Sequence, residues 1–290
     1  GLFVAGSSGV QGEWPKILLT RAEDGLLYLD HTLEDARARE HYIVKFGRGR
    51  NEALASILRH EAPYMALARM LGLRVHADLV LLKRALFIPR FDRQVTGEGV
   101  LRLGQESIAT LTGMPGVDAV PSHDEVCRQL LRQCTHPLTE VLEYIKRDVA
   151  NLALGNKDNH ARNTAVQRDF SGGIRLTPLY DFAPMYLHPD GIARRIRWEG
   201  NDSSAPDWNR VIDKVCEIAQ TLRNEKRMPS AQKKALREVC RPALVEGLRP
   251  MAETLKTIAA HGTDFGLEPA VHAHLKLGIE AQAQRLTALN

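Results

Sequence analysis

The polar run over residues 155–163 is the segment whose residue types and spacing most clearly indicate chemistry. It reads Gly-Asn-Lys-Asp-Asn-His-Ala-Arg-Asn and follows an apolar stretch with helical periodicity. Asp158 and Asn163 stand five positions apart in it, so in a loop the carboxylate can reach an attacking hydroxyl while the amide oxygen binds Mg²⁺. Asp181 lies further along between apolar neighbours, where a buried carboxylate is costly unless it binds a cation. Together the three residues favour phosphoryl transfer with magnesium.

Each of these signals also has an ordinary structural explanation. An Asp-x-x-x-x-Asn pattern arises by chance in many loops, and an isolated residue such as Asp181 is more often a helix cap or a turn residue. The Gly155-Asn156 pair is equally typical of a plain turn. The order of the surrounding segments is what favours the catalytic interpretation.

Three upstream features would complete such a site. Residues 6–12 form a glycine-rich segment whose backbone N–H groups can bind phosphates. Lys45 lies in an otherwise apolar run that predicts a strand over 42–46, where it can neutralise the α- and β-phosphates of a nucleotide. Glu61, in the helix that follows, can pair with Lys45 and orient it. Each feature also has a structural alternative when it is considered alone. The glycine-rich segment can be a turn, Lys45 a solvated lysine of a strand, and Glu61 an exposed charge on a helix.

The segment 87–93 ends this strand-rich part, where the adenine-binding hinge of a kinase falls. We therefore expect Phe87 and Ile88 to bind the nucleotide. The sequence presents, in order, a glycine-rich loop, a strand lysine, a helix glutamate, a hinge, the Asp-x-x-x-x-Asn pattern and a second aspartate. This is the order of parts in a protein kinase. The sequence lacks the Gly-x-x-x-x-Gly-Lys-Ser/Thr motif of the P-loop enzymes.

Hydrophobic periodicity predicts the elements that must position these residues. One helix is expected over 51–71, with a break at Pro63, among strands over 14–19, 26–29, 42–46, 75–82 and 85–88. From residue 93 onward the pattern is helical, interrupted by a hairpin over 165–176. These helices are expected over 124–134, 137–154, 208–225, 230–247, 249–261 and 268–289. The predicted fold class is α+β: a bilobal protein-kinase-like fold with a small β-rich N-lobe (1–92) and a large, mostly helical C-lobe (93–290).

Composition excludes several other classes of protein. The 290 residues are 44% hydrophobic and 26% charged, as in ordinary globular proteins. Lys and Arg number 39 against 35 Asp and Glu, and this net charge of +4 does not indicate direct binding of nucleic acid. No apolar run is long enough for a membrane span, so no membrane association is expected. The four cysteines lack metal-ligand spacing, which excludes the usual zinc motifs and fits a reducing cytoplasm.

Several other reactive residue types are predicted to be structural. The pair His60-Glu61 does not complete the His-Glu-x-x-His zinc motif, because position 64 is Tyr64. His160 is expected to hydrogen-bond within its loop. The arginines at 194, 195 and 197 are expected on a solvated face, with substrate docking as the alternative. The cysteines at 127, 134, 216 and 240 are expected to be small core residues.

These motifs resemble the HipA family of bacterial serine/threonine kinases, the toxins of type II toxin–antitoxin pairs. The resemblance covers nearly the whole chain and runs through residues 42–46, 60–73, 90–93, 101–106, 154–163 and 175–181. The last two segments are specific in combination. Within the family, the chain is most similar to the branch called YjjJ.

The resemblance implies a role for each matching residue. Lys45 would contact the phosphates of ATP, and Glu61 would be its partner. Asp158 would be the catalytic base that accepts the proton of a protein hydroxyl. Asn163 and Asp181 would hold Mg²⁺. The cofactors implied are therefore ATP and Mg²⁺.

The glycine-rich loop of the family usually reads Gly-x-Gln-x-Lys and bears a serine whose autophosphorylation switches the kinase off. The corresponding segment here is longer, and its Gly9, Gln11 and Lys16 are expected to bind ATP. Ser7 and Ser8 are the candidates for autophosphorylation. A phosphate on either would add negative charge where the ATP phosphates must bind, which explains inhibition.

The resemblance also implies partners. The substrate would be a protein, and aminoacyl-tRNA synthetases are candidates because some family members modify them. A helix-turn-helix antitoxin is a candidate partner, and relatives carry an N-terminal subdomain. Because the chain starts at Gly1, close to the phosphate loop, we expect these residues to be the kinase portion of a longer chain. The alternatives are an aminoglycoside-type small-molecule kinase of the same fold and a non-catalytic binding or regulatory pseudokinase.

Overall fold

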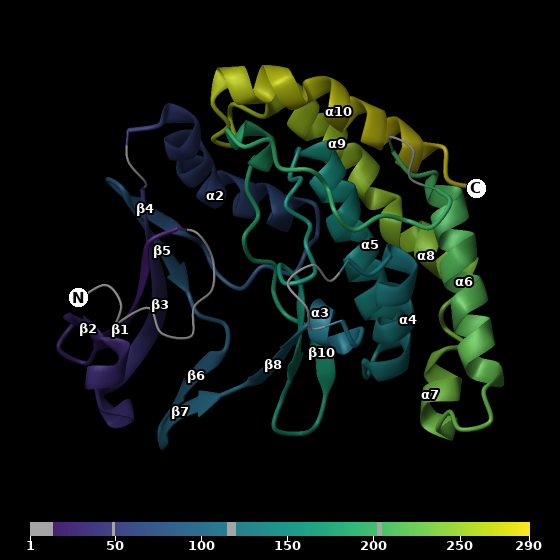
Figure 1. Cartoon of the computed structure of the whole chain (residues 1–290), viewed down its shortest axis with the longest axis horizontal. Coiled ribbons are helices and arrows are strands. Elements are labelled where there is room, and N and C mark those ends of the chain that lie inside the picture. Colours follow the sequence, from purple (N-terminus) through teal and green to yellow (C-terminus); the bar gives the residue numbers. More distant parts are fainter. Residues whose placement is uncertain (1–13, 48–49, 115–119, 202–204) are drawn as a thin grey trace.

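The computed structural model describes residues 14–47, 50–114, 120–201 and 205–290. A small antiparallel sheet region lies beside a larger helical part (Figure 1), which confirms the predicted fold class of two unequal lobes. Gly9, Gln11, Ser7 and Ser8, the residues predicted for the glycine-rich loop, lie outside the described residues. Within the described ranges, no helix combines the length and the apolar composition needed to cross a membrane.

The small lobe contains a five-stranded sheet in the order β2-β1-β3-β5-β4, with every neighbouring pair antiparallel. Its strands are β1 (Lys16–Ala22), β2 (Leu27–Leu29), β3 (Ala38–Phe46), β4 (Val80–Leu82) and β5 (Ala85–Pro89). The second half of the central strand β3, over residues 42–46, is aromatic and β-branched apart from Lys45, a composition that favours a strand. Its register places Lys45 opposite Lys16 of β1 and opposite Leu86 of β5. The predicted lysine strand and hairpin are confirmed, although β4 starts at Val80 rather than at residue 75.

Helix α2 (Glu52–Met70) packs beside this sheet and carries Glu61. Asn51 caps it by accepting a hydrogen bond from the N–H of Leu54 at 3.1 Å. The predicted break at Pro63 is wrong, because α2 continues through it. A proline removes one backbone hydrogen bond of the helix, and burial of side chains on this helix, including the fully buried Tyr64, holds the turn in place.

The chain after the hinge forms strands before it forms helices, contrary to the sequence-based prediction. Strands β6 (Arg93–Thr96) and β7 (Gly99–Arg102) make a hairpin. Strand β8 (Gly104–Ser107) and the short helix α3 (Ile108–Leu111) follow. Strand β8 pairs with β9 (Ala165–Arg168), which also pairs with β10 (Ile174–Leu176). The β9–β10 hairpin was predicted, whereas the pairing with β8 joins segments nearly sixty residues apart and leaves no local pattern.

The helices of the large lobe enclose one continuous apolar core. They are α4 (His123–Gln133), α5 (Pro137–Ala153), α6 (Trp208–Asn224), α7 (Ser230–Ala235), α8 (Arg241–Leu248), α9 (Pro250–His261) and α10 (Pro269–Thr287). The single helix predicted over 230–247 is in fact two, because residues 236–240 are not helical, and the second helix begins at Arg241 with Pro242 in its first turn. Of the four cysteines, Cys127 and Cys134 are buried as predicted, Cys216 is half-buried and Cys240 is exposed. The prediction of a core position is therefore wrong for Cys240.

Candidate active site

A cavity of about 1050 Å³ lies between the small sheet and the helical lobe. Strands β1 and β3, helix α2, the hinge, strand β8 and the loops after α5 and β10 all contribute to its wall. Its charged and polar lining residues are Lys16, Lys45, Glu61, His76, Arg90, Asp92, Gln105, Ser107, Thr110, His160, Arg162, Asn163, Tyr180 and Asp181. The cavity thus collects residues from both lobes.

Lys45 and Glu61 form a buried ion pair at this cavity. The Nζ atom of Lys45 lies 2.9 Å from Oε2 and 3.2 Å from Oε1 of Glu61. The two side chains are only 6% and 5% exposed, so each charge depends on the other for compensation. Burial alone would lower the pKa of Lys45, but Asp181 and Glu61 outweigh it and raise that pKa, so the ammonium stays charged.

Asp181 is the second carboxylate in contact with the Lys45 ammonium. Burial raises the pKa of Asp181, and the stronger attraction of Lys45 and Lys16 brings it below the ordinary value. Its backbone has a positive φ of 50°, a conformation that aspartate tolerates better than most residues. The next residue, Phe182, is buried against Tyr64 of α2 with ring centroids 5.3 Å apart. This packing fixes the loop that presents Asp181 to the cavity.

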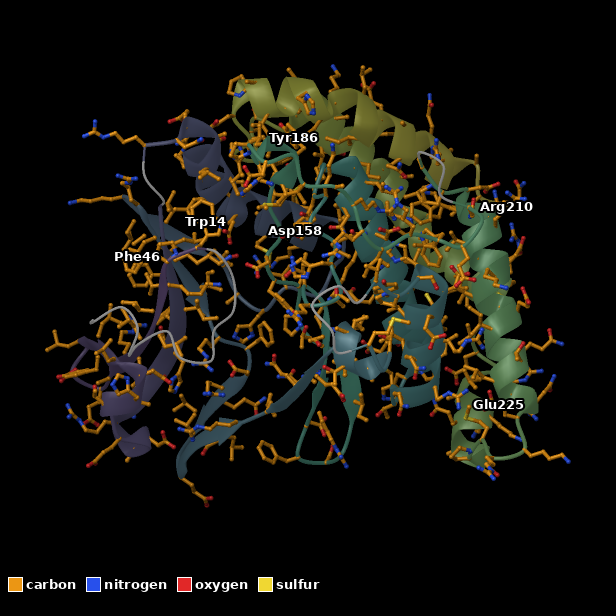
Figure 2. The ribbon with its side chains drawn as sticks, viewed as in Figure 1. Trp14, Phe46, Asp158, Tyr186, Arg210 and Glu225 are labelled. Atoms are coloured by element: carbon orange, nitrogen blue, oxygen red, sulfur yellow. The ribbon has the colours of Figure 1, made fainter. Side chains whose placement is uncertain are left out.

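Asp158 lies in the loop after α5, and Figure 2 shows it between the sheet and the helical lobe. Gly155 begins the loop with a φ of +65°, and a Cβ there would lie 2.8 Å from the ring of Tyr186. The Nδ2 atom of Asn163 donates to the carbonyl of Asp158 at 2.9 Å and to its Oδ2 at 3.2 Å. Asn163 lines the cavity. Asp158 lies next to Asn163 and is not itself one of the lining residues. The structure therefore brings the predicted base next to the predicted metal ligand.

Asn159 is a residue of this loop that the sequence reasoning missed. Its Nδ2 atom donates to the carbonyl of Ile196 at 2.9 Å. Its Oδ1 atom accepts from the N–H of Arg195 at 2.8 Å. The side chain thus replaces a strand partner for the segment 195–196 and holds it against the loop of Asp158. The polar run itself gave no signal that distinguished this amide from a turn residue.

The arginines after the Asp181 loop occupy two different environments. Arg195 and Arg197 are exposed, as predicted. Arg194 is 9% exposed and pairs with the buried Asp148 of α5 at 2.7 Å, so its prediction as a solvated residue is wrong. The indole of Trp198 also donates to Asp148 at 2.8 Å. Burial raises the pKa of Asp148, but the nearby cations and these donors bring it below the ordinary value.

The remaining predicted nucleotide residues fall on different sides of the sheet. Ile88 lines the cavity, whereas Phe87 is not a lining residue and its ring packs edge-on against Tyr42 at 5.9 Å. Successive side chains of a strand point to opposite faces, so both could not face the nucleotide. Lys16 lines the cavity at the start of β1, opposite Lys45. Burial has the largest effect on the pKa of the Lys16 ammonium and lowers it.

The hinge contains an ionic cluster that was not predicted. The guanidinium of Arg90 donates to both carboxylate oxygens of Asp92, at 2.9 and 2.7 Å. Arg93 donates to Asp92 as well, at 2.6 Å. Phe91 lies between them in the chain and stacks at an angle on Tyr180, with centroids 5.9 Å apart. The sequence shows the pattern Arg-Phe-Asp-Arg, but the ion pairs of both arginines with Asp92 form only because the chain turns at the hinge.

Comparison with known proteins assigns this fold and site to a family. The sequence matches the HipA-like C-terminal domain over residues 8–244, and the chain belongs to this family. The match covers the lysine strand, the hinge, the Asp158 loop and the Asp181 loop. The finer placement in the YjjJ branch stays a prediction.

Two similar proteins illustrate this membership. One is Y4mE of Sinorhizobium fredii, a kinase by its name, which is 32% identical to this chain over 111 residues. This alignment covers 36% of this chain and 26% of Y4mE. The HipA chain from the Shewanella oneidensis complex of HipA, HipB and operator DNA superposes with a TM-score of 0.62 at 22% identity. That superposition covers 96% of this chain and 64% of the HipA chain, and it confirms the bilobal fold. The chain therefore spans about a quarter of Y4mE and just under two thirds of this HipA.

Proposed function

We propose that this chain is an ATP- and Mg²⁺-dependent serine/threonine protein kinase of the HipA toxin type. The observation that carries the proposal is the position of the Lys45 ammonium, which contacts both Glu61 and Asp181 on the wall of the interlobe cavity. Asn163 lines the same cavity and is hydrogen-bonded to Asp158. A charged lysine, two hard oxygen donors and a carboxylate base are the groups that phosphoryl transfer needs.

The donor chemistry of the site fits a magnesium ion. Asn163 uses its amide nitrogen for Asp158, so its carbonyl oxygen can serve a cation. The Asp181 side chain keeps 39% of its surface exposed, and the low pKa of its carboxyl keeps it anionic. These two side chains provide fewer than the six oxygen ligands of Mg²⁺, and nucleotide phosphates usually provide others. When bound, the ion would neutralise charge on the phosphates.

The chain's own residues would divide the work as follows. Lys45 holds a positive charge on the cavity wall, where it neutralises the α- and β-phosphates of the nucleotide. Glu61 keeps the Lys45 side chain extended across the site. Asp158 accepts the proton of the serine or threonine hydroxyl. Ile88 and the other apolar residues of the hinge side exclude water from the nucleobase end of the cavity.

The decisive experiment is phosphoproteomics of a bacterial lysate incubated with ATP, Mg²⁺ and this protein. We expect new phosphoserine or phosphothreonine sites with the wild type, and a decrease of at least about 100-fold in their rate of formation with Asp158→Asn. The matched control is Asp190→Asn, because Asp190 is a largely exposed aspartate outside the cavity lining. Equal phosphorylation by wild type and Asp158→Asn would contradict the proposal. Phosphorylation of aminoglycosides or sugars alone would indicate the small-molecule alternative.

The proposal extends to partners and regulation. The Shewanella relative was solved in complex with HipB and operator DNA, and we include a helix-turn-helix antitoxin as a partner of this chain. An aminoacyl-tRNA synthetase is the first substrate to test in the lysate experiment. The same experiment would detect autophosphorylation of Ser7 or Ser8. A non-catalytic protein would show no phosphate on either serine.

A further inference from the structure

The face of α2 that precedes Glu61 is anchored to the far end of the chain. We propose that Glu268, at the start of α10, is a positioning residue that holds α2 in the orientation in which Glu61 meets Lys45. The inference rests on the proposed function only for its kinetic consequence. The anchoring itself is a property of the structure.

Both carboxylate oxygens of Glu268 bind α2. The Oε1 atom accepts a hydrogen bond from Nε of Arg59 at 2.8 Å. The Oε2 atom accepts from the hydroxyl of Ser56 at 3.0 Å. Burial raises the pKa of Glu268, but Arg59 and Ser56 outweigh it and lower that pKa, so the charged form is the one that binds. A hydrogen bond to a charged group contributes more than a neutral one.

The backbone of Glu268 binds α2 as well. Its N–H donates to Nε2 of His60 at 3.1 Å. The other ring nitrogen of the buried His60, Nδ1, lies 2.7 Å from the carbonyl of Ser56 and must donate to it, because a carbonyl only accepts. Nδ1 therefore carries the proton and Nε2 is the acceptor. The histidine is held in one tautomer by its own helix and presents that acceptor to α10.

The side chain of Glu268 does not cap its own helix. The residue precedes the first residue of α10, Pro269, in extended backbone. The short side chains preferred in this position, those of Ser, Thr, Asp and Asn, bind the free N–H groups of their own first turn. Here the side chain reaches across to another helix more than two hundred residues earlier in the chain.

The contacts fix the rotation of α2 about its axis. Ser56, Arg59 and His60 are spaced three and four residues apart, so they share one face of the helix. Glu61 directly follows His60, and its direction toward Lys45 is set once this face is held. One turn later, the hydroxyl of Tyr64 donates to the carbonyl of Leu154 at 2.7 Å. The turns on both sides of Glu61 are therefore tied to the helical lobe.

Loss of the Glu268 contacts would free the first of these two anchors. The helix could then rotate or shift, and Glu61 would meet Lys45 for a smaller fraction of the time. Lys45 would retain Asp181 as its other carboxylate partner. A lysine drawn toward the predicted metal ligand is poorly placed for phosphates, so we expect both weaker use of ATP and slower transfer.

The kinetic test compares Glu268→Ala and Glu268→Gln with a control on the same helix, Glu280→Ala, which removes an exposed glutamate. We expect Glu268→Ala to lower kcat/KM by about 10-fold, with a rise in the KM for ATP. Glu268→Gln keeps an acceptor and should recover part of the loss, and Glu280→Ala should match the wild type. A fall in kcat with an unchanged KM for ATP would indicate a smaller folded fraction and would overturn the positioning role.

Hydrogen–deuterium exchange tests the anchor without any assay of phosphate transfer. In Glu268→Ala we expect faster exchange of the amides of α2 around Glu61, and unchanged exchange in α5. Unchanged exchange in α2 would overturn the inference even in an active enzyme. Faster exchange in α2 together with an inactive wild type would support the anchor and contradict the proposed function, so the two failures are distinguishable.

Discussion

The Nζ atom of Lys45 lies 2.9 Å from Oε2 of Glu61, and this contact joins the central strand of the small sheet to helix α2. The same nitrogen contacts Asp181 from the helical lobe. Two consecutive elements and a loop distant in sequence therefore meet at one ammonium group.

Lys45→Met should destabilise the fold, because it leaves the buried carboxylate of Glu61 without its cation. Removing one partner of a buried ion pair typically costs about 3–5 kcal/mol. Urea unfolding would measure the loss. The double variant Lys45→Met/Glu61→Gln removes the stranded charge and should regain at least half of it. A single variant as stable as the wild type would show that the charge of Glu61 is compensated elsewhere.

Asp181→Asn should abolish the effect of Mg²⁺ on ATP binding, because it removes the negative charge of a predicted metal ligand. Asparagine also tolerates the positive φ of this position, so the fold should persist. Calorimetric titration of ATP with and without Mg²⁺ gives the measurement, with Asp190→Asn as the control. Mg²⁺-dependent binding that survives in Asp181→Asn would exclude this residue as a ligand.

Arg194→Met should destabilise the helical lobe at neutral pH, since it strands the Asp148 carboxylate, which is 2% exposed, beside Trp198. We expect a loss of about 3 kcal/mol or more. The folded pKa of Asp148 lies below its unfolded value, so its contribution is complete above about pH 4 and is lost as the pH falls through the folded pKa. The difference between wild type and variant in urea unfolding should therefore stay constant from pH 7 to about pH 4 and shrink as the pH falls from about 4 towards 2. A difference that does not shrink below about pH 4 would contradict the assignment.

Tyr64→Phe should cost about 1 kcal/mol, because it removes the hydrogen bond from the buried hydroxyl to the carbonyl of Leu154 and leaves that acceptor unpaired. The ring contact with Phe182 would be retained. The matched control is Tyr28→Phe, which removes an exposed hydroxyl bonded to Asp24 and should change stability by less than about 0.5 kcal/mol. Equal costs for the two variants would show that burial of the Tyr64 hydrogen bond adds nothing.

Much of the local structure was predictable because it depends on residues close in sequence. The β-branched and aromatic composition of residues 42–46 identified strand β3 with Lys45, and the helical period identified α2, α5 and α10. Boundaries failed at Pro63, which does not break α2, and over residues 236–240, which separate α7 from α8. Propensity at such positions is a small free-energy term that packing readily outweighs.

By itself, the sequence determined the order of the site residues, the family to which the chain belongs and the type of most elements, since spacing and periodicity are local properties. Only the tertiary structure decided which face of β5 meets the cavity, that Arg194 is buried against Asp148, and that Glu268 anchors α2. Each of these contacts joins segments whose separation in the chain carries no pattern. Their formation depends on how distant segments pack together, because a charge or hydrogen bond that is buried by packing is costly to lose.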